Sequence, residues 1–314
     1  MSPRVVVMVV ASVAVAVSAP WIGGALQGES GDFILQSLRL PRVIMACLVG
    51  ATLSLVGACY QTIFANPLAA PSTVGTTAGA TLGALVAVLA GSALGGMPGG
   101  LPVVAVSAFV AALGVSLFVA ALAGSGRARV NDVLLAGVAI SLAAGAISAG
   151  LQYSADELQL YAAVQWSLGH LPQVGYRGVL MIAPFVAITA GVLLSQTRAL
   201  QSLAAGEERA HSQGVNVAYV RSLVLGVGAL GVAACVAWCG PIAFVGLIVP
   251  HIVRLSVGTS RRVLLPMSAV MGAAFLVACD TAARNVLPGR ELPVGVLTAG
   301  IGAPLLVWLV ARRR

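Results

Sequence analysis

Cysteine and histidine side chains are the groups in this chain that could hold a metal ion or carry redox chemistry. Cys235 and Cys239 lie one helical turn apart, a spacing that a metal site or a redox pair can use. However, no Cys-X-X-Cys pair and no Cys/His spacing typical of a zinc site occurs, and all five cysteines lie in apolar segments, where buried packing is their usual role. The three histidines, His170, His211 and His251, fall in different parts of the expected topology. We therefore predict no metal site.

Nucleotide hydrolysis is restricted by the type of basic residue. All 17 basic residues are arginine, and the chain contains no lysine. A phosphate-binding loop of the P-loop type requires a lysine that reaches the β- and γ-phosphates. If ATP drives this protein, a separate chain must therefore bind the nucleotide.

The carboxylates do not form a catalytic centre. An enzyme needs an acid, a base and a nucleophile at a common depth, and an ion-coupled secondary transporter usually carries acidic residues in the middle of its spans. Here every carboxylate lies near the end of an apolar run or in a loop, which disfavours both classes: Glu29, Asp32, Asp132, Asp156, Glu157, Glu207, Glu208, Asp280 and Glu291.

The elements that position these groups are predicted to be membrane helices. Of 314 residues, 59% are hydrophobic and 8% are charged, whereas a soluble domain carries about 25% charged residues. Only helices and closed barrels satisfy their backbone in lipid, and runs such as 103–123 are apolar on every face, which excludes a barrel strand. The net charge of +8 comes from arginines at the ends of apolar runs, which does not favour a nucleic-acid partner.

Ten apolar runs predict an all-α polytopic protein with about ten transmembrane helices. The first, 5–21, is interpreted as a retained helix; the alternative is a signal peptide cleaved after residue 19. The runs are 5–21, 42–63, 75–95, 103–123, 132–152, 178–197, 218–238, 241–257, 263–282 and 293–311.

The arginines predict the orientation in the membrane. If the N-terminus is cytoplasmic, ten spans place the C-terminus in the cytoplasm as well. Twelve arginines then lie on the cytoplasmic side and five on the outer side, as the positive-inside rule requires. The outer five are Arg39, Arg42, Arg177, Arg284 and Arg290; the inner twelve are Arg4, Arg127, Arg129, Arg198, Arg209, Arg221, Arg254, Arg261, Arg262, Arg312, Arg313 and Arg314.

The longest polar stretch, 197–216, is predicted to form two short helices that project into the cytoplasm. Leu200 and Leu203 share one helical face, Gly206 interrupts the pattern, and Gly214 closes a second short turn. Docking of a partner is one interpretation of this segment, and an ordinary solvated loop is the other.

A second unusual segment is the RLPR sequence at 39–42. Arg39 and Arg42 lie on the side where arginine is disfavoured, and Pro41 suits the first turn of a helix. A pair of guanidinium groups is suited to bidentate capture of carboxylates. Anchoring to lipid headgroups is the alternative.

Five longer motifs together resemble the FecCD family of ABC-importer permeases. They are RLPRVIMACLVGATLSLVGACYQTIFANPLAAPSTVG (39–75), LLAGVAIS (134–141), GEERAHSQGVNV (206–217), GPIAFVGLIVPHIVRL (240–255) and ELPVGVLTAGIGAPLLVWLV (291–310). The resemblance implies one permease domain over 1–314 in the bacterial inner membrane. Its repeat-like halves, about 39–152 and 218–311, are related as an inverted repeat, and a cytoplasmic coupling loop spans 198–216.

The resemblance also implies partners. The expected assembly adds a second permease subunit, identical or homologous, and two ATPase subunits that bind ATP and Mg²⁺. A periplasmic or lipid-anchored substrate-binding protein completes it. No cofactor is expected in this chain, and the remaining contacts are with membrane lipid.

Particular residues acquire expected roles by matching the family motifs. Docking of the binding protein is expected at Arg39, Arg42 and Arg284, although an ion pair of Arg284 with Asp280 at i, i+4 is an alternative that could coexist. The cytoplasmic gate is expected at Val130 and Asn131, where the sequence departs from the small hydroxyl residues of the cobalamin member. Coupling to the ATPases is expected at Leu200, Leu203, Gly206, Glu207, Glu208 and Gly214.

The expected function is ATP-driven import of an iron chelate, either a ferric siderophore or haem, by alternating access. Cobalamin is the alternative cargo within the same family. An ion-coupled secondary transporter is the alternative from a different class.

Overall fold

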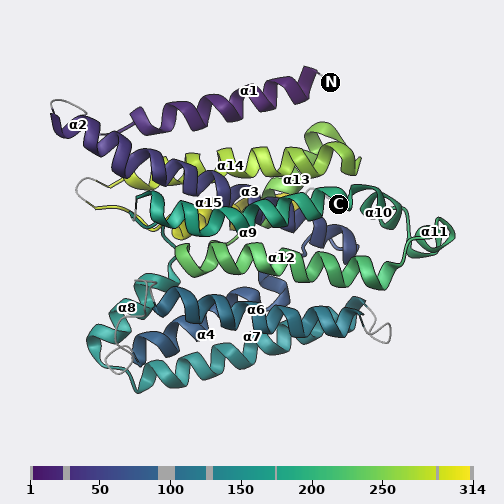
Figure 1. The fold of residues 1–314 in the computed structure, drawn as a ribbon, viewed down its shortest axis with the longest axis horizontal. Coiled ribbons are helices and arrows are strands. Elements are labelled where there is room, and N and C mark those ends of the chain that lie inside the picture. The colour runs from purple at the N-terminus through teal and green to yellow at the C-terminus, as the bar shows by residue number, and fades with distance from the viewer. Residues whose placement is uncertain are drawn as a thin grey trace.

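The computed structural model describes residues 3–23, 29–90, 103–124, 130–173, 175–287 and 290–311, and these residues form helices and their connections with no strand (Figure 1). Arg127, Arg129 and the arginines at 312–314, which the orientation prediction used, lie outside the described residues. The α-helices are α1 (Pro3–Ser18), α2 (Glu29–Phe33), α3 (Leu40–Ile63), α4 (Thr76–Leu89), α6 (Val103–Gly124), α7 (Val130–Tyr153), α8 (Glu157–Ser167), α9 (Tyr176–Ser195), α10 (Thr197–Leu203), α11 (Glu207–Ser212), α12 (Val217–Cys239), α13 (Val245–Val257), α14 (Arg261–Asn285) and α15 (Val294–Ala311).

The predicted fold class is confirmed. Among the described residues, seven helical segments are long and apolar enough to cross a membrane. Three shorter apolar helices, α4, α13 and α15, account for the other three predicted runs. The second span begins earlier than predicted, near residue 31, because α2 and a π-helical segment (Ile34–Arg39) lead directly into α3. The short helix α8 was not predicted.

α3 lies at the centre of the bundle and packs against α9, α12, α13 and α14. A Cβ atom on Gly57 would lie 1.8 Å from the carbonyl oxygen of Gly246 in α13, and one on Gly50 would lie 2.2 Å from that of Gly272 in α14. The helix backbones are therefore in direct contact, which small residues allow and which gives van der Waals packing where lipid supplies no hydrophobic drive. α1, by contrast, lies at the edge of the bundle and exposes valines such as Val7 (Figure 1).

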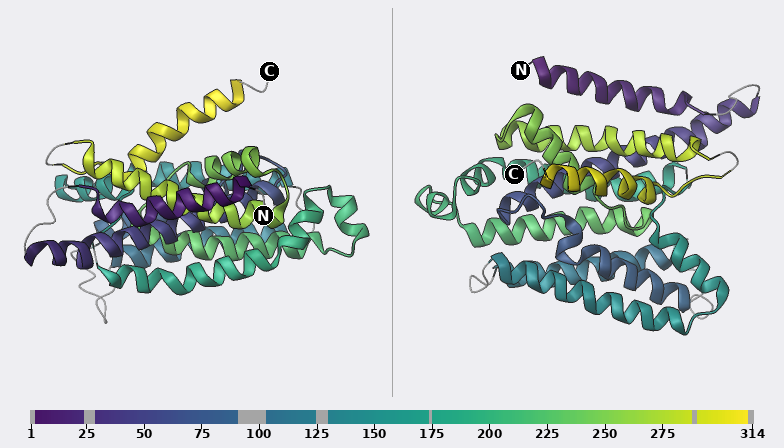
Figure 2. Two further views of the ribbon diagram at one scale, coloured as in Figure 1. Left: turned by 90° about the horizontal axis from the view of Figure 1, so that it is seen from above. Right: turned by 180° about the vertical axis from the view of Figure 1, so that it is seen from behind.

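The long helices run roughly along one axis, so the bundle has two ends (Figures 1 and 2). α10 and α11 project from one of them, which we call the α10 end. The opposite end, which we call the arginine end, contains the start of α3 and the last turn of α14, with Arg39, Arg42 and Arg284. α15 begins at the arginine end and leaves the bundle along its length, so that its C-terminal part stands apart from the other helices (Figure 2).

Candidate functional site

Two helix ends supply the charged groups of the arginine end. Pro41 lies at the junction of the π-helical segment with α3, and Arg39 and Arg42 flank it. Asp280 and Arg284 are four residues apart near the end of α14, so their side chains share one helix face. Because α3 and α14 pack along their length, the two pairs meet.

Arg42 is the centre of a buried ion network. Its Nε donates to Asp280 Oδ1 at 3.0 Å and to Oδ2 at 3.1 Å, and one terminal nitrogen donates to Oδ1 at 2.9 Å. The other terminal nitrogen donates to Glu291 Oε2 at 2.8 Å. The Arg42 and Asp280 side chains are 6% and 2% exposed, so this pair has little contact with solvent. Such a pair is stable because the bidentate geometry offsets the cost of removing both charges from water.

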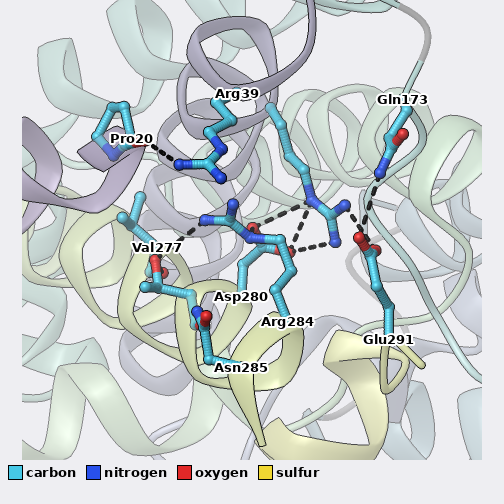
Figure 3. Close-up of polar contacts among 10 residues, drawn as sticks. Pro20, Arg39, Gln173, Val277, Asp280, Arg284, Asn285 and Glu291 are labelled. Carbon is cyan, nitrogen blue, oxygen red and sulfur yellow. Dashed lines mark hydrogen bonds and ion pairs between the residues drawn. The ribbon is translucent and has the colours of Figure 1, made fainter. Parts of the chain in front are cut away.

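Two further residues extend the network. Arg284 Nε lies 3.2 Å from Asp280 Oδ2, which confirms the ion pair expected from their spacing. Glu291, in the connection between α14 and α15, also accepts a hydrogen bond of 3.3 Å from Gln173 Nε2. Figure 3 shows Asp280 and Arg284 side by side, with Glu291 reaching the network from the opposite side to Arg39.

Arg39 lies one helical turn before Arg42 and donates to the carbonyl oxygen of Pro20 at 3.0 Å. Its side chain borders a cavity of about 230 Å³ that Arg42, Arg284 and Glu291 also line. The structure therefore brings together all three arginines that the sequence analysis assigned to docking. Guanidinium groups around a cavity can recognise a carboxylate through paired hydrogen bonds.

A second cavity of about 440 Å³ lies beside the first and shares Arg42, Gln173 and Glu291 with it. His170 also lines it. Burial and the nearby Arg42 guanidinium lower the pKa of His170 from its usual 6.5, so the imidazole is neutral at pH 7.

Sequence reasoning missed the pairing of Arg42 with Asp280 and Glu291. The partners are 238 and 249 residues away along the chain, so no local periodicity reports them. One signal was present: all three residues were predicted at the outer ends of spans, where opposite charges at the same depth tend to pair.

At the α10 end, the predicted pair of short helices joined by glycine is confirmed as α10 and α11. Leu200 and Leu203 are buried against the bundle. Gly206 has φ +116°, a backbone conformation that glycine adopts readily and that turns the chain between the helices. Gly214 ends the unit with φ +76°. We call residues 197–214 the α10–α11 knob.

Side chains fix this knob to the bundle. Glu207 forms an ion pair with Arg221 of α12. The Gln201 side chain accepts from the backbone N–H of Arg261, at the first residue of α14, at 2.6 Å. Glu208 is exposed and projects from the knob. The knob is therefore attached to α12 and α14, both of which belong to the packed core of the bundle.

The expected gate residues lie at the start of α7. Asn131 is exposed, and Val130 is the first residue of the helix. Gly124, the last residue of α6, approaches Ser222 of α12, and the end of α6 and the start of α7 both lie at the α10 end (Figure 1). Residues 125–129 lie outside the described part.

The cysteines lie in the packed interior. Cys235 and Cys239 on α12 are buried, and each of the five cysteines is a free thiol. Within the described residues, no group of three or more His, Cys, Asp or Glu side chains is arranged to hold a metal ion.

Comparison with known proteins gives matches along almost the whole chain. The model of the FecCD transport family matches residues 4–312. The chain is 39% identical over 286 residues to the cobalamin import system permease protein BtuC of Halobacterium salinarum, covering 91% of this chain and 75% of that protein. It is 37% identical over 278 residues to the hemin transport system permease protein HmuU of Yersinia pestis, covering 88% of this chain and 83% of that protein. A solved structure described as an inward-facing conformation of a metal-chelate type ABC transporter superposes with a TM-score of 0.87 and 31% identity over 98% of each chain.

Proposed function

The chain belongs to the FecCD transport family, and from this premise we propose that it is the membrane-spanning permease subunit of an ATP-driven importer that moves an iron chelate across the bacterial inner membrane. The observation that carries the proposal is the superposition, over 98% of both chains, on a metal-chelate type ABC transporter. The permease does no chemistry itself; it alternates between outward and inward access.

The proposed cargo is a ferric siderophore or haem. The metal-chelate neighbour and the hemin permease of Yersinia pestis both support this choice. Cobalamin is the second candidate, since the 39% identical relative from Halobacterium salinarum is a cobalamin permease.

The proposed assembly contains a second permease subunit, two ATPase subunits that bind ATP and Mg²⁺, and a substrate-binding protein. This chain itself holds no cofactor. The absence of lysine from the sequence supports a separate ATPase chain, because a P-loop cannot be built without one. A single permease domain with inverted-repeat halves is part of the same proposal.

We place the α10 end in the cytoplasm, together with both termini. The α10–α11 knob then contacts the ATPases, and its links to Arg221 and Arg261 carry their movement into α12 and α14. Val130 and Asn131 form part of the cytoplasmic gate, since the start of α7 lies at this end. The arginine end then faces outward and receives the binding protein.

Docking relies mainly on complementary charge. Arg39, Arg42 and Arg284 line one cavity, and two carboxylates, Asp280 and Glu291, pair with them, so one positive charge is in excess. This excess of positive charge attracts acidic side chains and sets the encounter rate and orientation of the binding protein more than its affinity.

Reconstitution tests the proposal directly. The permease is placed in vesicles with its ATPase and binding protein, and uptake of ferric siderophore, haem and cobalamin is measured with and without ATP. We expect uptake of an iron chelate that requires ATP and is blocked by vanadate. Uptake without the ATPase, or uptake driven by an ion gradient alone, would refute the proposal and support a secondary transporter.

Charge reversal tests the docking face. Arg39→Glu is expected to reduce stimulation of uptake by the binding protein, whereas Arg4→Glu, an exposed arginine at the start of α1, is the matched control and should have little effect. Unchanged stimulation in Arg39→Glu would show that the binding protein docks elsewhere.

A further inference from the structure

The two carboxylates that hold Arg42 differ in how firmly they are bound. Asp280 is 2% exposed and accepts three hydrogen bonds from Arg42. Glu291 is 49% exposed and accepts one. A half-exposed carboxylate can return to water at little cost, whereas a buried one cannot. Of the two, only Glu291 is therefore in a position to leave Arg42.

Glu291 also links two parts of the fold. Its two carboxylate oxygens accept from Arg42 and from Gln173, which belong to different parts of the fold. These three residues, which we call the Glu291 bridge, line both cavities of the arginine end, of about 230 and 440 Å³. Glu291 is therefore at the boundary that the two cavities share.

The bridge is directly connected to α15. Glu291 lies three residues before the first residue of α15. Just after it, Leu292 donates its N–H to the Ala283 carbonyl oxygen at 3.1 Å, and Gly295 donates to the Gly169 carbonyl oxygen at 3.1 Å. These contacts help to hold the start of α15 at the arginine end. Farther along, Gly302 packs against Phe244 and Ile248 at the start of α13, and only the C-terminal part of α15 stands apart (Figure 2).

We propose that Glu291 is an internal substitute for a docking carboxylate: an acidic side chain of the binding protein replaces it on Arg42, and segment 290–293 loses its ion pair with α3, which loosens the start of α15. The proposal rests on the proposed function, because it assumes that an acidic partner docks at the arginine end. Arg39, one turn before Arg42 and on the same cavity, provides the first contact for the incoming group.

Carboxylate exchange explains how a buried arginine can take part in docking. Arg42 is 6% exposed and fully paired, so the simple capture of a further anion would require an extra buried charge. Exchange leaves the number of charges around Arg42 unchanged, because one carboxylate enters as another leaves. Asp280 stays in place throughout and keeps α3 and α14 joined.

The test measures the affinity of the importer's own substrate-binding protein for the complete transporter in nanodiscs. Glu291→Gln removes the competing charge and is expected to tighten binding roughly two- to fivefold, as for a partly exposed charge pair. Asp32→Asn is the matched control, since Asp32 is an exposed carboxylate on α2 at the same end. Its removal changes net charge equally and is expected to alter binding less than twofold.

A second variant keeps the net charge constant. Gln173→Leu removes the other partner of Glu291, so Glu291 should leave Arg42 more easily and binding should again tighten. This variant also tests the carboxylate exchange if Glu291→Gln fails to fold. Basal ATP hydrolysis should rise in both variants, because the start of α15 is less firmly held; a purely structural role of Glu291 would lower thermal stability without tightening binding.

The outcomes separate this inference from the docking proposal. If Arg39→Glu weakens binding while Glu291→Gln and Gln173→Leu leave it unchanged or weaken it, the exchange is refuted and docking at the arginine end stands. If Arg39→Glu has no effect, docking at this end is refuted, and the exchange is refuted with it.

Discussion

Replacement of Asp280 by asparagine is the most direct test of the buried ion network. Asparagine has nearly the same volume and keeps one oxygen that can accept a hydrogen bond, so packing is preserved and the negative charge is lost. Asp280 is the shared partner of Arg42, through three hydrogen bonds of 2.9 to 3.1 Å, and of Arg284, at 3.2 Å. The variant leaves two buried guanidinium groups with Glu291 as the remaining carboxylate of the network.

The expected cost follows from this burial. Removal of one partner of a buried ion pair typically costs about 3–5 kcal/mol, because the other charge stays desolvated. Asp280 is 2% exposed, so solvent screening does not reduce this figure. The ratio of folded to unfolded protein should therefore fall roughly a hundred- to several-thousand-fold.

The assay is an unfolding titration of the purified permease in mixed micelles. Asp32→Asn, which removes an exposed carboxylate at the same end, is the control and should unfold at the wild-type midpoint. A triple variant, Arg42→Met with Asp280→Leu and Arg284→Met, should recover most of the lost stability, because apolar side chains of similar size replace these three members of the network and the half-exposed Glu291 can turn to solvent. If Asp280→Asn and Asp32→Asn unfold at the same denaturant concentration, the ion network does not hold α3 to α14.

Three further predictions follow from other parts of the fold. Gly57→Ala should prevent close packing of α3 on α13 and sharply reduce the yield of monodisperse protein, since its Cβ would lie 1.8 Å from the carbonyl oxygen of Gly246. Gly114→Ala is the control and should leave the yield unchanged, because a Cβ there would meet only open space. Arg221→Gln should release Glu207 and reduce uptake per ATP hydrolysed, while the amount of protein in the membrane is unchanged; tight coupling in this variant would contradict the role of the α10–α11 knob. Because the pKa of His170 is lowered by burial, the unfolded chain takes up a proton first as pH falls, so stability should be lost below pH 6.5 and His170→Gln should remove that loss; an unchanged pH profile of unfolding would count against it.

The helical plan could be predicted from the sequence because its causes are local. Ten apolar runs separated by Gly, Pro and charged residues correspond to ten helices, since each run must satisfy its own backbone in lipid. The glycine-joined pair α10 and α11 was predicted from the spacing of Leu200, Leu203 and Gly206. α8 was missed, although Asp156 and Gln159 form a capping box that marks its start.

The candidate site was predictable only in part. Spacing within one helix was enough to pair Asp280 with Arg284, and the RLPR sequence was enough to single out Arg39 and Arg42. Which carboxylates face those arginines depends on how α3, α14 and the segment before α15 pack together. Residue spacing carries no information about contacts more than 200 residues apart.

Composition and local pattern thus determined that this protein is a helical membrane bundle, where its helices lie and which residues carry unusual charge, because hydropathy and helix periodicity act over neighbouring residues. Tertiary structure alone decided that Arg42 is buried, that Asp280 holds it firmly and that Glu291 holds it loosely. The reason is physical: the strength of an ion pair depends on burial and on the position of both partners, and those are properties of the packed helices.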